Sequence, residues 1–165
     1  MPARKILIVS DSHGYEAGLK RLLLKIEEME EKPDCIFHLG DFVFDGTFLE
    51  EESSIPVHAV SGNCDIWGSE EPEDKLFTIN GRSILITHGH NYRVKSGLLQ
   101  LSYYAEENGI DICCFGHTHA MVILKENGRM FLNPGSLMRP RTGKPGYIML
   151  TIDDGGKAQA DFYEL

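Results

Sequence analysis

Five times along this chain, a short apolar run stops at a polar loop in which glycine stands beside aspartate, asparagine or histidine. The runs cover residues 5–9, 34–39, 56–60, 83–87 and 110–115. Runs of this length and composition are typical of buried strands, and open α/β sheets bind ligands at the carboxyl ends of their strands. We therefore expect five loops to converge at one place, namely Asp11-Ser12-His13, Gly40-Asp41, Gly62-Asn63-Cys64-Asp65, His88-Gly89-His90 and Gly116-His117-Thr118-His119.

The remaining patterns predict helices and antiparallel strands around these runs. Apolar residues recur at helical spacing over 16–29, and a second helix is expected over 96–107, ending at Asn108-Gly109. Asn80-Gly81 separates two strand-like runs and is typical of a two-residue hairpin. Further strands are expected over 121–125, 130–132, 146–152 and 158–163. Parallel-type strands early and antiparallel strands late predict two packed sheets with helices outside, in a single domain spanning 1–165.

Charge and cysteine content exclude several classes of protein. The formal net charge of −9 disfavours extended nucleic-acid binding through a basic face. The first apolar run is too short for a signal peptide or a membrane span, which predicts a cytoplasmic protein with no membrane partner. The cysteines lack zinc-ribbon spacing, and we interpret Cys35, Cys113 and Cys114, which lie in apolar runs, as reduced core thiols.

The loops are rich in metal-binding side chains. They hold five of the seven histidines of the chain. Imidazole, carboxylate and amide oxygen together suit divalent Mn²⁺, Fe²⁺, Co²⁺, Ni²⁺ or Zn²⁺, with Mn²⁺ our first choice, whereas structural zinc more often uses thiolates. The donors are too many for one ion and could fill two sites about 3.5–4 Å apart that share a carboxylate. They are Asp11, His13, Asp41, Asn63, His88, His117 and His119.

The five motifs, in this order, resemble those of the calcineurin-like metallophosphoesterases. The short chain, the Gly62-Asn63-Cys64-Asp65 motif in place of GNHD or GNHE, and the later Asn133-Pro134-Gly135-Ser136 are similar to the small YfcE-type phosphodiesterases. The resemblance implies a four-layer α/β/β/α sandwich of two mixed sheets flanked by helices, the metallo-dependent phosphatase fold. It implies one metal held by Asp11, His13, Asp41 and His119. It implies that Asp41 bridges to a second metal completed by Asn63, His88 and His117, with His90 as a substrate contact and Asp65 as a support behind the metals.

A two-metal site predicts the type of reaction that the protein catalyses. A bridging water loses a proton near neutral pH, and the resulting hydroxide attacks phosphorus in line with the leaving group. In the family, the histidine of GNH is thought to protonate the leaving group, but Cys64 stands in its place here. A thiol is smaller than imidazole and mostly protonated at pH 7, so we expect weaker assistance and a preference for a small phosphodiester substrate with a good leaving group.

Several residues have plainer interpretations. His38 and His58 lie inside strand-like runs and are interpreted as hydrogen-bonded or surface histidines, and His90 is equally consistent with a phosphate contact and a loop hydrogen bond. Asp11 and Asp41 could serve as helix caps or turn formers, but His13 and Gly40 in the same motifs argue against this as their sole role. Cys64 is better interpreted as a small filler than as a nucleophile. Asn133–Ser136 is interpreted as a supporting turn, and Arg139 and Arg141 as either phosphate contacts or exposed loop arginines.

Alternative functions remain open at the level of the sequence. The same site could hydrolyse phosphomonoesters or the pyrophosphate bond of a dinucleotide. The fold could also act as a non-catalytic protein-binding scaffold, as in the retromer subunit that resembles this family but has lost part of its metal site. The stripe of Leu and Tyr over 98–104 is interpreted as core or as the interface of a homo-oligomer, either a dimer or a tetramer.

Overall fold

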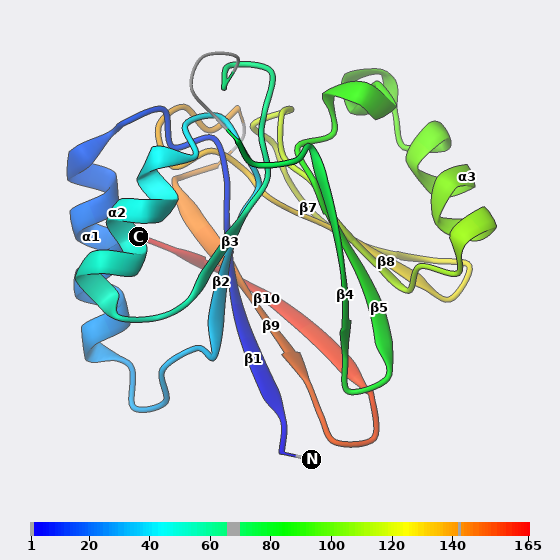
Figure 1. Ribbon diagram of the computed structural model, residues 1–165, viewed down its shortest axis with the longest axis horizontal. Helices are drawn as coiled ribbons and strands as arrows, with labels where there is room; N and C mark the ends of the chain where they lie inside the picture. Colours follow the sequence, from blue (N-terminus) through cyan, green and yellow to red (C-terminus); the bar gives the residue numbers. More distant parts are fainter. Residues whose placement is uncertain (1, 66–69, 142) are drawn as a thin grey trace.

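Across residues 2–65, 70–141 and 143–165, the computed structural model forms two five-stranded mixed sheets that pack face to face between outer helices (Figure 1). Helices α1 (Glu16–Glu28) and α2 (Phe44–Ser53) cover one outer face, and α3 (Leu99–Asn108) covers the other. The architecture is the four-layer α/β/β/α sandwich that the sequence predicts.

The first sheet has the order β10-β9-β1-β2-β3. Its parallel strands are β1 (Arg4–Val9), β2 (Cys35–His38) and β3 (Val57–Ala59). The antiparallel pair β9 (Gly146–Ile152) and β10 (Ala158–Glu164) joins it along β1. The C-terminal strands therefore complete the N-terminal sheet, and early and late strands do not form separate sheets.

The second sheet has the order β4-β5-β6-β8-β7. Parallel strands β5 (Arg82–Thr87), β6 (Ile112–Cys114) and β8 (Arg129–Pro134) form its centre. Antiparallel β4 (Asp74–Ile79) and β7 (Met121–Glu126) form its edges. The predicted hairpin at Asn80-Gly81 is confirmed, since both residues have positive φ, at 48° and 82°. Short 3₁₀ turns η1 (His90–Tyr92) and η2 (Val94–Ser96) lead into α3.

Alternation along the strands divides the core into three clusters. In β1, Ile6 and Ile8 point into the space between the sheets, while Leu7 and Val9 point toward α1 and α2. In β5, Ile84 joins the central cluster and Leu85 packs under α3. Because successive strand side chains point to opposite faces, near-continuous apolar strands of this kind suit sheets buried on both sides.

Helix α2 was not predicted from the sequence. It buries Asp45, Gly46 and Leu49 and leaves Phe44 56% exposed, so its apolar residues do not form a helical stripe. The helix packs on α1 and β3, where the buried Gly46 leaves room for the Val57 side chain. Tertiary packing therefore determines this helix more than local pattern does.

All four cysteines are free thiols, and Cys35, Cys113 and Cys114 are buried, as the sequence predicts for core cysteines. Burial raises the pKa of Cys35 to about 11 and that of Cys113 to about 12. Within the described ranges, no helix has the length and apolar content that a bilayer crossing demands.

We predict that Leu22→Ala lowers the free energy of unfolding by about 2–5 kcal/mol, because Leu22 is fully buried between α1 and the first sheet. Leu24→Ala is the matched control on the same helix, where the side chain is 58% exposed and the expected change is below about 0.5 kcal/mol. Urea denaturation followed by circular dichroism measures both. Equal losses would contradict the assigned packing of α1.

Candidate metal centre

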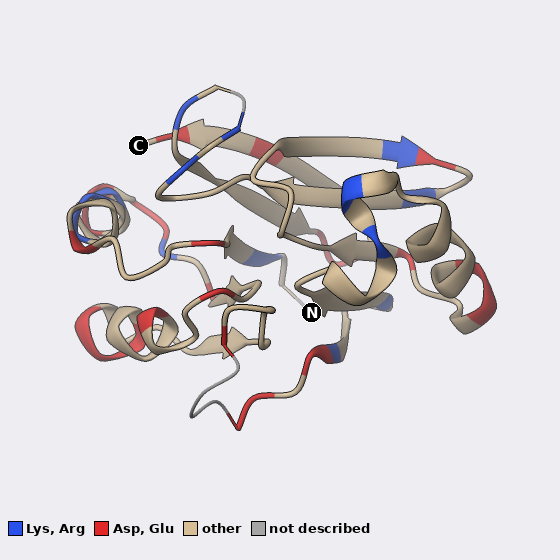
Figure 2. Cartoon of the chain, turned by 90° about the horizontal axis from the view of Figure 1, so that it is seen from above, with Lys and Arg blue, Asp and Glu red and all other residues tan. Residues whose placement is uncertain are grey.

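At one end of the sandwich, backbone hydrogen bonds join the loops that follow β1 and β2 and, separately, the loops that follow β5 and β6. Asp11 N–H donates to the Gly40 carbonyl at 3.1 Å, and Gly116 N–H donates to the His88 carbonyl at 2.9 Å. Figure 2 looks down on this end of the molecule. The two pairs meet where His117 N–H donates to Asp11 Oδ2 at 3.1 Å. The predicted convergence therefore holds for loops that are more than 100 residues apart in sequence.

Four of the predicted ligands form a tight cluster there. One donor atom from each lies within 4.8 Å of the others, and the four residues are Asp11, His13, Asp41 and His119. From Asp11 Oδ1, His119 Nε2 lies at 3.1 Å and His13 Nε2 at 3.8 Å. His13 Nε2 is also 3.6 Å from Asp41 Oδ2. This set is the one that the resemblance implies for the first metal.

His88 and His117 extend the cluster on the other side of Asp41. His88 Nε2 lies 3.4 Å from Asp41 Oδ1 and 3.2 Å from His117 Nδ1. His88 Nδ1 lies 2.7 Å from the Leu39 carbonyl, and the hydrogen bond between them fixes the ring orientation. Asp41 thus has imidazoles on both sides, as a carboxylate shared between two metals requires.

The electrostatics of this cluster suit a cation. Burial alone would raise the pKa of the Asp11 carboxyl, but the imidazoles of His119, His13 and His88 outweigh burial and lower it. At His117, burial and the neighbouring His88 lower the pKa to about 4, so this imidazole is neutral at pH 7 and able to bind a metal.

Two buried polar atoms of the cluster have no hydrogen-bond partner among the described residues. They are Asp11 Oδ1 and His13 Nε2. An unsatisfied buried polar group costs about 1–3 kcal/mol, and such groups are rare in folded proteins. A divalent cation between these atoms would satisfy both. The residues present therefore fit a metal of the borderline class that binds imidazole and carboxylate.

The backbone of the cluster is strained. Asp11, His13, Asp41, His117 and His119 all have φ between 48° and 69°. Such a conformation costs about 1–2 kcal/mol for a residue with a Cβ atom, and strain of this kind concentrates at functional sites. The strained residues are five of the seven predicted ligands.

Asp65 and the Asn133–Ser136 segment hold the loops in place. The segment was interpreted from the sequence as a turn, but Asn133 and Pro134 are the last residues of β8, and Gly135 and Ser136 follow the strand. The Asp65 carboxylate accepts hydrogen bonds from the backbone N–H groups of Phe42, Val43 and Gly62, at 2.7, 3.0 and 2.9 Å. Ser136 Oγ donates to the Asp11 carbonyl at 2.7 Å. Asn133 Nδ2 donates to Thr118 Oγ1 at 2.9 Å. Asp65 thus supports the Asp41 loop from behind, and the end of β8 with Ser136 supports the Asp11 and His119 loops.

Asn63, Cys64 and His90 lie at the edge of the cluster. The Asn63 amide contacts Cys64 Sγ at 3.8 Å, and no hydrogen bond between described residues joins it to Asp41, His88 or His117. Its place in the second metal site therefore stays a prediction. Cys64 N–H donates to Asp41 Oδ1 at 3.0 Å, while burial and Asp41 raise the pKa of its thiol to about 11. His90 Nδ1 is buried without a partner among the described residues, and His90 Nε2 lies 3.7 Å from Glu73.

His38 and His58 have the structural surroundings expected of them. His38 is buried, with Nε2 2.8 Å from Ser12 Oγ and Nδ1 accepting the Gly40 N–H at 3.2 Å. The His58 ring packs against the stacked rings of Phe37 and Phe77, with ring centroids 6.1 and 4.9 Å away. Neither belongs to the cluster.

A basic cavity of about 270 Å³ borders the cluster. It is lined by His117, Thr118 and His119 together with three cationic residues, Lys95, Arg139 and Arg141. Figure 2 shows acidic and basic segments both on the outer helices and on the loops at this end. His119 Nδ1 lies 3.0 Å from the Arg139 carbonyl, and Arg141 N–H donates to the His119 carbonyl at 2.6 Å. The sequence alone left both arginines open and gave no signal for Lys95.

We predict that Gly62→Ala weakens Mn²⁺ binding by about 10–100-fold, the range seen when groups that orient a ligand are altered. A Cβ atom at Gly62 would lie 2.5 Å from Asp41 N and closer still to Asp41 Oδ1, so it must displace the carboxylate. Gly155→Ala is the control, since its nearest neighbour would be 3.5 Å away. Calorimetric titration with Mn²⁺ measures both, and equal affinities would contradict the role assigned to Asp41.

Two relatives in sequence resemble this chain over most of its length. A probable metallophosphoesterase of Bacillus subtilis, YsnB, is 37% identical over 160 residues, which cover 96% of this chain and 90% of the relative. A phosphodiesterase of Methanocaldococcus jannaschii is 26% identical over 155 residues, or 86% of this chain and 89% of the relative.

Among solved structures, Vacuolar Protein Sorting 29 of Cryptosporidium parvum superposes with a TM-score of 0.74. The two are 20% identical, and the match covers 100% of this chain and 99% of that one. This likeness concerns the fold alone. The profile of the calcineurin-like phosphoesterase superfamily domain matches residues 5–155. The chain therefore belongs to the calcineurin-like phosphoesterase superfamily.

Proposed function

We propose that this protein is a phosphodiesterase that works with two divalent metal ions, Mn²⁺ in the first instance. The observation that carries the proposal is the cluster of Asp11, His13, Asp41 and His119 within 4.8 Å, in which Asp11 Oδ1 is buried and lacks a hydrogen bond among the described residues. The family supports a metal-dependent phosphoester hydrolase. The name of the M. jannaschii relative supports a diester as substrate.

The proposal assigns each predicted ligand to one of two metals. Asp11, His13 and His119 would hold the first, Asn63, His88 and His117 the second, and Asp41 would serve both. When bound, the two ions would supply positive charge against the phosphate and lower the pKa of water into the neutral range. The closeness of His88 Nε2 to both Asp41 Oδ1 and His117 Nδ1, at 3.4 and 3.2 Å, supports the second set.

The chain's own cations would orient the substrate. The cavity beside His117 and His119 is lined by Lys95, Arg139 and Arg141. Their side chains would donate hydrogen bonds to a phosphate oxygen or to an anionic substituent of the substrate. Guanidinium groups bind phosphate oxygens in pairs, which fixes orientation as well as charge. These three side chains would hold the group that is not transferred. His90 and Asn63 line a different cavity, of about 470 Å³.

Cys64 would be a poor proton donor to the leaving group. It occupies the position of the family's histidine, and its thiol, with a pKa of about 11, is a weak acid. A general acid contributes about 10²–10⁴-fold when the leaving group is a poor one. Substrates whose leaving group departs without a proton should therefore be favoured.

The central test is hydrolysis of bis(p-nitrophenyl) phosphate by the purified chain with Mn²⁺. We expect Asp41→Asn to lower kcat/KM by about 100-fold or more, because it removes the carboxylate shared by both metals. Asp154→Asn makes the same chemical change at an exposed turn and should leave the rate unchanged. Equal rates for Asp41→Asn and the parent chain would exclude the proposed centre.

Cys64→Ala should keep kcat/KM within about a factor of three of the parent chain, because nitrophenolate departs without a proton and the Cys64 thiol is only a weak acid. The p-nitrophenyl assay at saturating Mn²⁺ measures the ratio. A loss comparable to that of Asp41→Asn would mean that Cys64 takes part in the chemistry.

Substrate preference provides a further prediction. With the parent chain, kcat/KM for bis(p-nitrophenyl) phosphate should exceed that for an alkyl monoester such as glycerol 3-phosphate by about 100-fold, the lower end of what a general acid contributes. The two rates are compared by release of nitrophenol and of inorganic phosphate. If the alkyl monoester is the better substrate, the phosphomonoesterase alternative replaces the diesterase.

The scaffold alternative is tested by the same preparation. A protein that binds partners through this fold without catalysis would hydrolyse no member of a panel of cyclic nucleotides, dinucleotides and glycerophosphodiesters, even with Mn²⁺ bound. Cleavage of a dinucleotide at its pyrophosphate bond would instead favour the pyrophosphohydrolase alternative. Hydrolysis of a diester in the panel favours the proposal.

A further inference from the structure

Three cationic side chains beside the proposed metal ligands have no ionic partner in the part of the chain that the structure describes. They line the basic cavity of about 270 Å³ next to His117 and His119, and they are Lys95, Arg139 and Arg141. Acidic residues outnumber basic ones in this chain by 25 to 16, so most cations could find a carboxylate. Cations that stay unpaired at one cavity therefore indicate an anionic ligand.

Hydrogen bonds of the backbone anchor the two arginines to the loops of the cluster. Arg141 N–H donates to the His119 carbonyl at 2.6 Å, and Arg139 N–H donates to Ser136 Oγ at 2.9 Å. Ser136 Oγ in turn donates to the Asp11 carbonyl at 2.7 Å. The segment that carries both guanidinium groups is thus held by two of the proposed metal ligands, and a ligand would meet it at a low cost in ordering.

Packing of the preceding residue fixes the position of Lys95. Val94 is 4% exposed and fills the space at Gly89, where a Cβ atom would lie 2.9 Å from Val94 Cγ2. Gly89 directly follows His88 in the chain. The pKa of His117 is lowered by burial, by His88 and by the charge of Lys95, so the Lys95 ammonium lies close to the His117 ring. All three cations therefore border the proposed centre itself.

The phosphate of a diester does not by itself need these cations. In the proposed centre, Asp11, Asp41, a hydroxide and the singly charged diester together balance two divalent ions. The three cations would then lack a counter-ion unless the substrate carries further negative charge. Their cavity is smaller than the range of about 300–1,000 Å³ typical of complete small-molecule sites, so it suits one group of a larger ligand. A second phosphate group fits both the charge and the donors, since guanidinium binds phosphate oxygens in pairs.

The cavity beside Asn63 and His90 has the opposite charge. Its described lining includes no Lys or Arg and three carboxylate residues, Asp65, Glu71 and Glu73. Glu71 is paired with Lys75 at 2.7 Å, so the other two give the cavity its negative charge. Cys64, which stands in the place of the family's proton donor, lies between two residues of this lining, so the leaving group is expected on this side. An anionic leaving group would meet like charge there.

We propose that the basic cavity binds a second phosphate group, carried by the arm of the diester that stays on phosphorus. The inference rests on the proposed phosphodiesterase function and narrows its substrate to diesters with one phosphorylated arm and one uncharged arm. In the reaction, the oxygen of water bonds to phosphorus and one of its protons passes to solvent. The bond from phosphorus to the uncharged arm breaks, and the departing oxygen keeps the electron pair. The phosphorylated arm leaves the site as a bisphosphate.

The test compares two substrates that differ only in the second phosphate. They are thymidine 5′-(p-nitrophenyl phosphate) and the same compound with a phosphate on its 3′ oxygen. With the full chain and Mn²⁺, we expect kcat/KM to be at least about tenfold higher for the 3′-phosphorylated diester, because hydrogen bonds between charged groups are worth at least one such step. Chromatography should identify the products as nitrophenol and thymidine 3′,5′-bisphosphate.

Two variants of the arginine segment separate charge from geometry. Arg139→Gln/Arg141→Gln should reduce the preference for the 3′-phosphorylated diester to below about threefold. Arg139→Lys/Arg141→Lys keeps both charges but loses paired donation, so its preference should lie between that of the parent chain and that of the glutamine variant.

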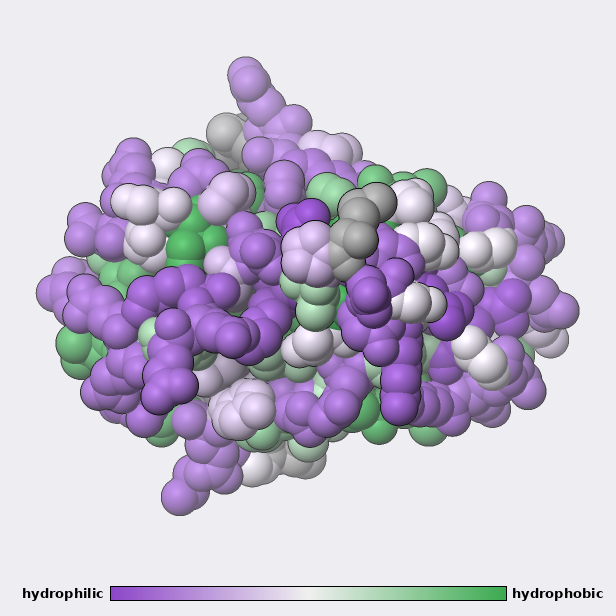
Figure 3. All heavy atoms as spheres, turned by 90° about the horizontal axis from the view of Figure 1, so that it is seen from below, coloured by the Kyte–Doolittle hydropathy of each residue, from purple (hydrophilic) through white to green (hydrophobic). Residues whose placement is uncertain are grey.

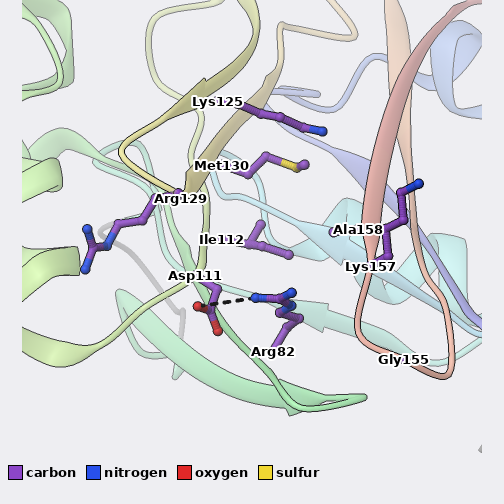
Figure 4. Close-up of a pocket in the computed structure, with 10 residues that line it drawn as sticks. Arg82, Asp111, Ile112, Lys125, Arg129, Met130, Gly155, Lys157 and Ala158 are labelled. Carbon is purple, nitrogen blue, oxygen red and sulfur yellow. Dashed lines mark ion pairs between the residues drawn. The ribbon is translucent and has the colours of Figure 1, made fainter.

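A control variant removes the same charge at the far end of the molecule. Lys125 and Lys157 border a cavity of about 340 Å³ there, together with Arg82 at the start of β5 (Figure 4). Because His88 follows the last residue of β5, roughly 20 Å separate this cavity from the metal cluster. Seen from below, this end is mostly hydrophilic, with smaller apolar areas between the polar side chains (Figure 3). Lys125→Gln/Lys157→Gln should therefore keep the substrate preference of the parent chain.

A second measurement does not depend on turnover. Calorimetric titration in Mn²⁺ compares thymidine 3′,5′-bisphosphate with thymidine 5′-monophosphate. The parent chain should bind the bisphosphate at least about tenfold more tightly, and Arg139→Gln/Arg141→Gln should bind the two nucleotides almost equally.

The outcomes distinguish this inference from the function on which it rests. Equal kcat/KM for the two diesters, or a preference undiminished in Arg139→Gln/Arg141→Gln, overturns the inference and leaves the phosphodiesterase proposal standing. Release of nitrophenyl phosphate in place of nitrophenol also overturns it, because the phosphorylated arm would then be the one that leaves. If neither diester is hydrolysed, the phosphodiesterase proposal fails, and equal affinities for the two nucleotides would then overturn the second-phosphate site as well.

Discussion

The burial of two neighbouring aspartates is the physical constraint on which the rest of this structure depends. Asp11 is fully buried and Asp41 is 3% exposed, and each carboxylate faces several imidazoles. Burying a charge costs several kcal/mol unless it is paired and hydrogen-bonded. Without a metal, the two negative charges are offset only by protonating imidazoles such as His13 and His88, whose pKa values the aspartates raise. Divalent cations offset the same charges by binding these nitrogen and oxygen atoms directly. The proposed metal centre is therefore the arrangement that makes the burial of Asp11 and Asp41 favourable.

The fold supplies what such a centre needs. Parallel strands from both sheets end at the same edge, so their loops meet although they are far apart in sequence. Glycine at positions 62 and 116 lets backbone approach the two carboxylates, since a Cβ at Gly116 would lie 2.7 Å from Asp11 Oδ2. The strained loops are held by hydrogen bonds to Asp65 and Ser136. The strained backbone of these loops and the hydrogen bonds that stabilise it thus belong to one network around the site.

Much of this arrangement could be predicted from the sequence because short local patterns of residues determine it. Apolar runs that end in polar loops predicted the strands and the edge where donors gather, and Asn80-Gly81 predicted its hairpin. Helix α2 was missed because packing against β3, and not an amphipathic stripe, determines it. The pairing of β9 with β1 and the placement of Arg139, Arg141 and Lys95 in one cavity are long-range outcomes that no local pattern specifies. The orientation of Asn63 belongs to the same category.

The most direct test of the central claim is anomalous diffraction from a crystal grown with Mn²⁺. The account predicts two anomalous peaks about 3.5–4 Å apart, with Asp41 touching both, Asp11, His13 and His119 around one, and His88 and His117 around the other. A map with no peak between these side chains, or with manganese bound only elsewhere on the surface, would contradict it.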